Sequence, residues 1–162
     1  MVDEVIDIVD KNNQVTGNAT RREMRDGRLI HRASYVLVFN NKGEIFVHKR
    51  TITKDVFPGY YDVAAGGVVL AGESYEASAD RELFEELGIK APLVSRFDHF
   101  HDTTDNRVWG RVFTCIHEGP MKFQESEVES GEFMAVKDVL GMSLEKPFTP
   151  DGIEILHKCL EG

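Results

Sequence analysis

Short runs of apolar and β-branched residues, separated by turn residues, recur along this chain and predict a series of strands. The run ASYVLVF from Ala33, the loop NNKG and the segment EIFVHK predict a β-hairpin, because strand-forming residues flank a polar loop that contains glycine. Gly66 and Gly67 are expected to separate two short strands. The strands outside the hairpin are expected near residues 5–9, 62–65, 68–70, 93–101, 107–117 and 132–136.

Helical signals are fewer. Thr20 and Glu23 form a capping-box pattern that opens a short helix, which Gly27 closes. Apolar residues recur every four positions in a second helix that begins after Ser74 as N-cap and ends at Gly88. Two further helical segments are expected near residues 137–140 and 150–160. Many strands interrupted by few helices, without alternating βαβ order, favour an α+β fold with helices packed on a mixed sheet.

The length of 162 residues fits one domain, residues 1–162, in which residues 1–30 form an N-terminal hairpin and helix extension. Lys11, Asn12, Asn13 and Gly17 are expected to be turn material, and residues 124–132 an acidic loop. No stretch approaches the roughly 20 apolar residues of a membrane span, and the N-terminus lacks a secretory signal, so a cytoplasmic location is expected. Cys115 and Cys159 lack metal-site or redox spacing and are expected to be structural thiols in a reducing compartment.

The acidic charge balance argues against polyanionic binding partners. The formal net charge of -9 provides no basic footprint for nucleic acid or an anionic membrane, so neither is expected as a partner. An anionic substrate would need locally placed cations. A homodimer is one expected assembly, and the sequence leaves the oligomeric state open.

One helix concentrates acidic residues. Glu82, Glu85 and Glu86 are spaced i, i+3 and i+4, so their side chains share one face, with Arg81 and Lys90 as the cations within pairing distance. Two full charges at this spacing repel by roughly 3 kcal/mol at an effective dielectric constant of 20. A solvated helix surface is the plain interpretation of such a run. A hard divalent cation such as Mg²⁺ would relieve the repulsion, because it prefers oxygen ligands.

The segment around this helix is identified as a Nudix box, residues 67–89, by residue types at fixed spacing. They are Gly67, Glu73, Arg81, Glu82, Leu83, Glu85, Glu86, Gly88 and Ile89. The resemblance implies an α/β/α sandwich, with the box helix and the C-terminal helix packed against a mixed central sheet, and metal-dependent hydrolysis of a diphosphate linkage. It implies Glu82, Glu85 and Glu86 as ligands of Mg²⁺ or Mn²⁺, which the Gly67 carbonyl can join. It also implies a supporting pair, Glu73 and Arg81, which braces the loop against the helix.

Outside the box, residues 4–160 resemble the isopentenyl-diphosphate isomerase-like branch of the family. The matching segments are VDKNNQVTG, Ile30-His31-Arg32, HKRTITKDVFPGYYD and ESEVESGEFMAV. Arg50 and Lys54 match positions that hold the diphosphate in the isomerases, and both residue types suit phosphate oxygens. Solvated cations at a strand end are the alternative. Where isomerases carry a catalytic Cys followed by Gly-His, this chain has Gly66-Gly67-Val68, and no carboxylate stands at residues 106–109.

Some residues carry weaker predictions. Arg107, Trp109 and Arg111 alternate along one strand, so they can share one wall of a substrate cleft, although sheet packing is equally expected. His31 matches an isomerase metal ligand, and a structural or substrate-facing role is favoured here. The pair His99 and His101 shares a strand face and could chelate a metal, but no third ligand is within sequence reach.

A second acidic cluster, at residues 125, 127 and 129, occupies a loop, where Nudix hydrolases often place a catalytic base or an extra metal ligand. Glu127 is the candidate, against a plain solvated loop.

Three functions follow from these patterns. The leading one is a Mg²⁺- or Mn²⁺-dependent hydrolase of a nucleoside-diphosphate or other organic diphosphate substrate. The alternatives are an isopentenyl-diphosphate isomerase, and a non-catalytic nucleotide-sensing Nudix domain. The organic half of the substrate stays open, because the box engages only metal and phosphates.

Overall fold

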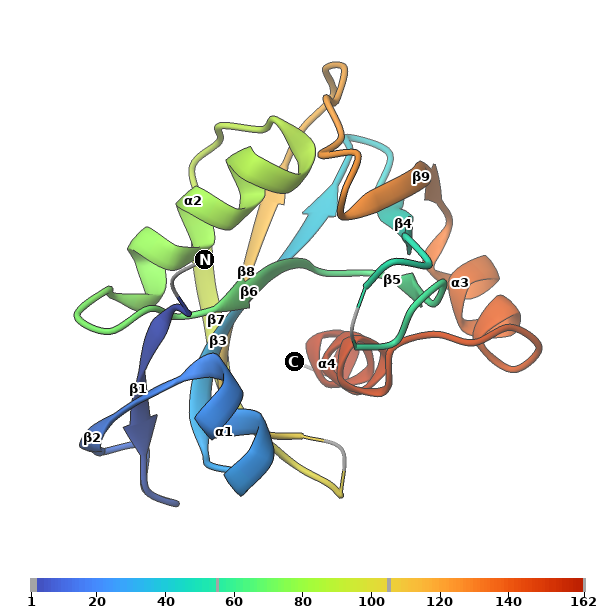
Figure 1. Cartoon of the computed structure of the whole chain (residues 1–162). Coiled ribbons are helices and arrows are strands. Elements are labelled where there is room, and N and C mark those ends of the chain that lie inside the picture. The colour runs from blue at the N-terminus through green and yellow to red at the C-terminus, as the bar shows by residue number, and fades with distance from the viewer. Residues whose placement is uncertain (1–2, 55, 105, 162) are drawn as a thin grey trace.

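The structure is a computed structural model that describes residues 3–54, 56–104 and 106–161 (Figure 1). Within these residues the strands are β1 (Val5–Val9), β2 (Val15–Thr20), β3 (His31–Phe39), β4 (Ile45–Arg50), β5 (Tyr61–Asp62), β6 (Ala65–Val68), β7 (Val94–Asp102), β8 (Arg107–Ile116) and β9 (Val128–Met134). The helices are α1 (Arg21–Gly27), α2 (Tyr75–Leu87), α3 (Val136–Ser143) and α4 (Pro150–Glu161). In this described part of the chain, no helix has the length and apolar character needed to cross a bilayer.

Strand β3 is the centre of the sheet. One edge pairs in parallel with β8 along its whole length, from His31↔Val108 to Phe39↔Ile116, and β7 pairs antiparallel with the far side of β8. The other edge meets β1, β6 and β4 in turn, each antiparallel. Strand β4 carries β5 and β9, so the sheet curls away from a flat layer (Figure 1). The predicted hairpin of β3 and β4 is confirmed.

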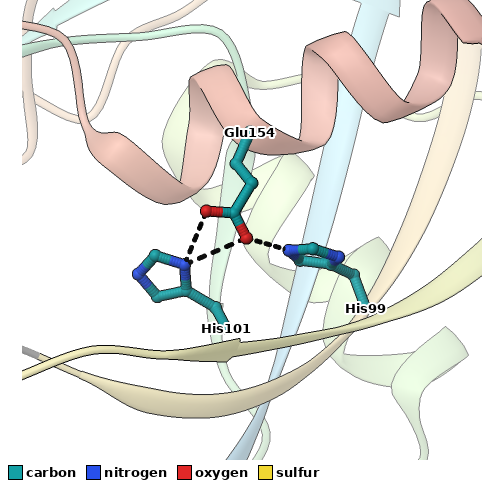
Figure 2. A group of neighbouring side chains, drawn as sticks. All are labelled: His99, His101 and Glu154. Atoms are coloured by element: carbon teal, nitrogen blue, oxygen red, sulfur yellow. Dashed lines mark hydrogen bonds and ion pairs between the residues drawn. The ribbon is translucent and has the colours of Figure 1, made fainter.

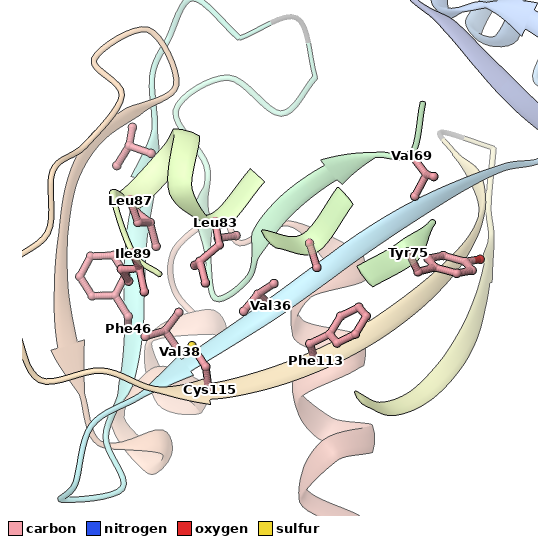
Figure 3. Close-up of a cluster of buried hydrophobic side chains, with 13 residues drawn as sticks. Val36, Val38, Phe46, Val69, Tyr75, Leu83, Leu87, Ile89, Phe113 and Cys115 are labelled. Atoms are coloured by element: carbon pink, nitrogen blue, oxygen red, sulfur yellow. The ribbon is translucent and has the colours of Figure 1, made fainter. Parts of the chain in front are cut away.

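Two hydrophobic cores lie on opposite faces of this sheet, because side chains alternate along each strand. Val36 and Val38 of β3 face α2 and pack with Leu83 and Leu87 (Figure 3). Leu37 faces the other way, into a core completed by residues of α3 and α4, which include Val139, Ile155 and Leu156. The predicted α+β fold and its α/β/α sandwich are therefore confirmed.

The helix of the Nudix box has the predicted ends. The Ser74 hydroxyl accepts a hydrogen bond from the Ala77 N–H at 3.0 Å, and Gly88 ends the helix with a left-handed φ of 69°. Leu83 and Leu87 are each only 1% exposed, so the apolar stripe anchors the helix to the sheet and fixes which residues face outward.

Three details differ from the sequence predictions. Gly17 lies in β2 and not in a turn, because residues 15–20 pair with β1. Gly66 and Gly67 lie inside one strand, β6, where they pair with Tyr35 and Ser34 of β3. Strand β9 begins at Val128, within the predicted acidic loop, because β4 offers it a pairing edge. Each difference arises from a partner strand that is distant in sequence.

Candidate active site

The backbone of β6 lies unusually close to its neighbours. Gly66 has a φ of 148°, and a Cβ built there would lie 2.0 Å from the Ser34 carbonyl oxygen. A Cβ at Gly67 would lie 2.9 Å from the Glu82 carboxylate. The position of Gly66 therefore requires glycine, whereas a side chain at Gly67 would displace the end of the Glu82 side chain. The carboxylates of α2 approach the strand because no side chain intervenes.

Glu86 is the most enclosed carboxylate of the box. Its side chain is buried, the residue is 9% exposed, and one oxygen accepts the Gly66 N–H at 3.3 Å. Burial, with the nearby charge of Glu82, raises the pKa of Glu86 to about 8. A carboxylate in this position is charged at neutral pH only when a cation lies close to it.

Arg81 organises the remaining charges. Its guanidinium bonds to Glu73 through two nitrogens, at 2.8 and 3.0 Å, and contacts Glu82 at 2.9 Å and Glu85 at 3.4 Å. Glu73 also accepts the Leu70 N–H at 3.1 Å, so the pair joins the loop before the helix to the helix itself. Burial raises the pKa of Glu82 although Arg81 opposes this, whereas Glu85 is half-exposed.

The box carboxylates fit a divalent cation by their chemistry, although the structure does not draw them into one tight cluster. Among the described residues, the group of three potential ligands whose donor atoms lie within 4.8 Å of one another is His99, His101 and Glu154, and not the box. The box donors are all oxygens, and burial makes the charges of Glu82 and Glu86 costly. Hard oxygen donors with uncompensated charge are what Mg²⁺ and Mn²⁺ bind.

A cavity of about 330 Å³ opens beside this helix and is lined by Gly66, Gly67 and Glu86. Within the described part of the chain its cations outnumber its carboxylates, although the molecule as a whole is acidic. The cations are Arg21, Arg25, Arg28, Arg50, Lys54 and Arg107; the carboxylates are Asp62, Glu86 and Asp151. The cavity thus supplies the local positive charge that an anionic substrate requires.

Three of these cations belong to α1 and the residue that ends it, and the sequence reasoning missed them. Arg21, Arg25 and Arg28 are spaced i, i+4 and i+7, which places them along one side of the N-terminal helix. That spacing was the available signal. The extension at residues 1–30 therefore contributes to the wall of the cavity.

Arg50 and Lys54 both line the cavity, as their predicted role requires. The Arg50 guanidinium donates to the Val56 carbonyl at 2.9 and 3.2 Å and lies 3.9 Å from Asp62. Lys54 forms an ion pair with Glu127, and its charge lowers the pKa of Glu86. Lys54 thus lies near the box carboxylates, and Arg50 lies beside Asp62 on the same cavity.

Glu127 reaches the site through this ion pair and does not line the cavity wall itself. Its loop is fastened to the end of α2, since the Gln124 N–H donates to the Glu86 carbonyl at 2.9 Å. The assignment of Glu127 as catalytic base stays a prediction.

The wall expected from Arg107, Trp109 and Arg111 does not form. Arg107 lines the cavity, but Trp109 stacks on Phe100 with ring centroids 5.0 Å apart and donates from Nε1 to the Lys11 carbonyl. Arg111 lies with Trp109 on a separate hollow and is held by Asp98. Packing against the N-terminal hairpin draws Trp109 away from the substrate cavity.

Buried polar groups complete the cavity. His31 contacts the Leu29 carbonyl through Nδ1 at 3.3 Å, and burial lowers its pKa to about 4, so the ring is neutral. Burial, with the charge of Asp151, raises the pKa of Asp62 to about 6. The Tyr35 hydroxyl donates to Asp151 at 2.8 Å, and neither residue was singled out from sequence.

A strand, a loop and a helix thus place the box carboxylates beside a cationic cavity, an arrangement that suits an anionic substrate. The model of the NUDIX domain matches residues 29–159. The chain therefore belongs to the Nudix family, and it is a hydrolase that acts on phosphorus-containing anhydrides.

The relatives agree. The chain is 40% identical over 160 residues to the uncharacterised Nudix hydrolase PA4841 of Pseudomonas aeruginosa, covering 98% of this chain and 95% of that protein. It is 40% identical over 154 residues to the uncharacterised Nudix hydrolase YfcD of Escherichia coli K12, covering 94% and 84%.

Two solved structures share the fold. The crystal structure of DR0079 from Deinococcus radiodurans superposes with a TM-score of 0.85 at 23% identity, covering 96% of this chain and 99% of that chain. The NUDIX domain of Shewanella oneidensis NrtR, complexed with ADP ribose, gives a TM-score of 0.64 at 15% identity, covering 88% and 98%.

Proposed function

We propose that this protein hydrolyses a diphosphate linkage in a nucleoside-diphosphate or other organic diphosphate substrate, and that Mg²⁺ or Mn²⁺ is its cofactor. The observation that carries the proposal is Glu86, a buried carboxylate on the Gly66 N–H at the edge of a cation-lined cavity. Glu82, Glu85 and Glu86 would hold the metal. When bound, the ion neutralises phosphate oxygens and lowers the pKa of a coordinated water.

The chain's own residues divide the remaining work. Arg50, Lys54 and Arg107 line the cavity and would bind the phosphates, because guanidinium and ammonium groups donate to phosphate oxygens. Arg81 holds the loop to the helix and so positions Glu82. If Glu127 accepts the proton of the attacking water, it must first separate from Lys54.

Gly66 disfavours the isomerase alternative. The isomerase-like branch carries its catalytic Cys at this position, and here even a Cβ would lie 2.0 Å from the Ser34 carbonyl oxygen. The residues that resemble that branch, Arg50 and Lys54, serve diphosphate binding, which a hydrolase also needs. We therefore propose that the chain is a hydrolase, and the isomerase-like frame stays a prediction from the sequence.

A hydrolysis screen with Mg²⁺ or Mn²⁺ tests the proposal. The panel holds nucleoside diphosphates, ADP ribose, which the NrtR domain binds, and diphosphate esters of small alcohols, including isopentenyl diphosphate. We expect release of phosphate or a nucleotide from at least one of them. Glu86→Gln should lower kcat by about 10³-fold or more, because removing one such charge costs about 4 kcal/mol in the transition state.

The matched control is Asp80→Asn, an exposed carboxylate on the same helix, which should keep its activity. A second readout is the stabilisation that Mg²⁺ binding gives. Mg²⁺ at 100 times the dissociation constant of the wild type should raise the free energy of unfolding of the wild type by about 2.7 kcal/mol. The same Mg²⁺ concentration should stabilise Glu86→Gln less. Equal activity in wild type and Glu86→Gln would contradict the proposal. Tight nucleotide binding by calorimetry without turnover would favour the nucleotide-sensing alternative.

A further inference from the structure

A second group of metal-binding side chains lies outside the cavity. His99 and His101 project from β7, and Glu154 projects from α4 toward both rings (Figure 2). None of the three lines the cavity of the box. The structure thus supplies the third ligand that the histidine pair lacked in the sequence, from a helix more than fifty residues further along the chain.

The spacing of the donor atoms suits a single small ion. Nδ1 of His101 lies 3.3 Å from one carboxylate oxygen of Glu154 and 3.4 Å from the other, and Nε2 of His99 contacts the same carboxylate. All three donors lie within 4.8 Å of one another. A tetrahedral Zn²⁺ with ligands at about 2.0–2.1 Å has ligand-to-ligand separations of about 3.4 Å. Only small side-chain movements would therefore bring an ion into coordination.

The surroundings also favour a metal. The imidazoles are well enclosed, with 14% and 6% of their side chains exposed for His99 and His101, whereas the Glu154 side chain is 45% exposed. The two rings are therefore held in place, and the open side through Glu154 gives an ion access from solvent. Two imidazoles with one carboxylate suit Zn²⁺, Ni²⁺ or Cu²⁺ more than Mg²⁺.

We propose that His99, His101 and Glu154 bind one transition-metal ion of the Zn²⁺ class, with water in the remaining position, and that this ion fastens α4 to β7. The expected effect is mechanical. Helix α4 also carries Asp151, one helical turn before Glu154. Asp151 accepts a hydrogen bond from the Tyr35 hydroxyl in the cavity. The ion would hold one wall of the substrate cavity from outside.

The position of Lys158 weakens the expected metal binding, because its ammonium group stands beside His99. Its Nζ lies 3.4 Å from Nδ1 of His99, where a metal-bound imidazole would carry a proton and need an acceptor. Lys158 is exposed on α4, and its Nζ also donates to the Asp98 carbonyl at 3.5 Å, so its replacement leaves the buried core intact. Replacing it with a carboxylate would create the carboxylate-histidine-metal arrangement that strengthens metal binding.

Calorimetric titration with Zn²⁺ in excess Mg²⁺ tests the proposal, because Mg²⁺ occupies the oxygen ligands of the box. We expect one Zn²⁺ per chain and a higher thermal midpoint with Zn²⁺. His101→Gln and Glu154→Gln should each weaken binding more than about tenfold. Glu82→Gln should retain the Zn²⁺ site. Because Glu154 is half-exposed on a helix, its variant folds even if loss of the buried His101 perturbs the strand.

Lys158→Glu provides the sharper result. It should tighten Zn²⁺ binding, with Lys158→Ala between it and the wild type. Absence of Zn²⁺ binding in the wild type would overturn the proposal, as would equal affinity in wild type and Glu154→Gln. Loss of the Zn²⁺ site in Glu82→Gln would also overturn it and assign the ion to the box. Failure of the hydrolysis screen would leave these binding results unaffected.

Discussion

At the scale of single residues, Gly66 links the shape of the sheet to the chemistry of the site. Its backbone N–H points at Glu86, and its α-carbon lies so close to β3 that no side chain fits. The same residue therefore positions a buried carboxylate and closes the space in which a catalytic thiol would stand.

Replacing Gly66 by Ala tests this double role. The added Cβ would clash with the Ser34 carbonyl at a φ that L-residues rarely adopt, so we expect a loss of about 2–4 kcal/mol in the free energy of unfolding. The measurement is denaturant unfolding. Gly141→Ala in α3 is the control, since nothing lies within 4 Å of its Cβ position, and it should stabilise by about 0.5–1 kcal/mol. A Gly66→Ala variant as stable as the wild type would contradict the close approach.

Sequence predicted some site residues and missed others for identifiable reasons. Arg50 and Lys54 both line the cavity, because Arg50 ends β4 and Lys54 lies in the turn that follows it. Trp109 does not, because the N-terminal hairpin offers its ring a partner that no local pattern reveals. The carboxylate beside His99 and His101, Glu154, comes from α4, whose position depends on the second core.

At the scale of elements, α1 lies against the cavity, whereas the sequence predicted only an N-terminal extension. Its capping box is present, with the Thr20 hydroxyl accepting the Glu23 N–H at 3.1 Å, so the helix is firmly started. Because the helix has only seven residues, the cap at its N-terminus determines on which side of the helix its arginines lie. One side of α1 faces the cavity and the other faces solvent.

Substitution of one arginine on each side of α1 tests whether only the cavity side contributes to substrate binding. Arg25→Gln should raise KM for a diphosphate substrate about tenfold with kcat nearly unchanged, because a cation that only binds phosphate acts equally in ground and transition states. Arg22→Gln, on the exposed side, should leave both constants unchanged. Steady-state kinetics at fixed ionic strength measures the effect. Identical constants for the two variants would remove α1 from the site.

The elements themselves were predictable where local signals suffice. Caps and apolar spacing predicted α2 to within a residue at each end, because Ser74 and Gly88 stop the helix without outside help. Strand β6 and the start of β9 were not predictable in this way. Gly66 and Gly67 are weak strand formers, and residues 128–131 look like loop, so only pairing with β3 and β4 makes them strands.

At the scale of the whole molecule, the sign of the charge inside the cavity is opposite to the sign of the net charge. The chain carries a formal charge of -9, yet among the described residues cations predominate in the lining of the cavity beside Glu86. A low-dielectric cavity focuses this local field, which draws anions inward although the molecule as a whole is acidic. Net charge alone therefore predicted the need for local cations but not their source.

Buried titratable groups give the molecule opposing responses to pH. Burial, with the charges of Arg50 and Lys54, lowers the pKa of His48 to about 3 from its usual 6.5. Its contribution to stability is therefore lost as the pH falls from 6.5 toward 3, because the unfolded chain binds the proton first. Glu86 and Asp62 have raised pKa values, near 8 and 6, and act in the opposite direction.

Comparing the wild type with His48→Gln isolates the effect of His48 on the pH dependence of stability from the effects of Glu86 and Asp62. Between pH 6.5 and 4.5, the wild type should lose stability relative to the variant by about 1.4 kcal/mol per pH unit. Urea unfolding at several pH values measures the difference. His157→Gln, an exposed histidine of α4, should show no such trend. A constant difference between wild type and His48→Gln would mean that His48 protonates normally in the folded state.

The parallel pairing of β3 with β8 has a consequence for how the protein is made. Strand β3 comes from the first quarter of the chain and β8 from the second half, yet β8 completes the sheet under both cores. While the ribosome has released the box helix but not β8, the apolar face of α2 lacks Phe113 and Cys115 as partners. Such long-range closure slows folding and leaves that face open to misassociation. The nascent chain therefore gains the helix of the Nudix box before it gains the strand that covers the apolar face of that helix.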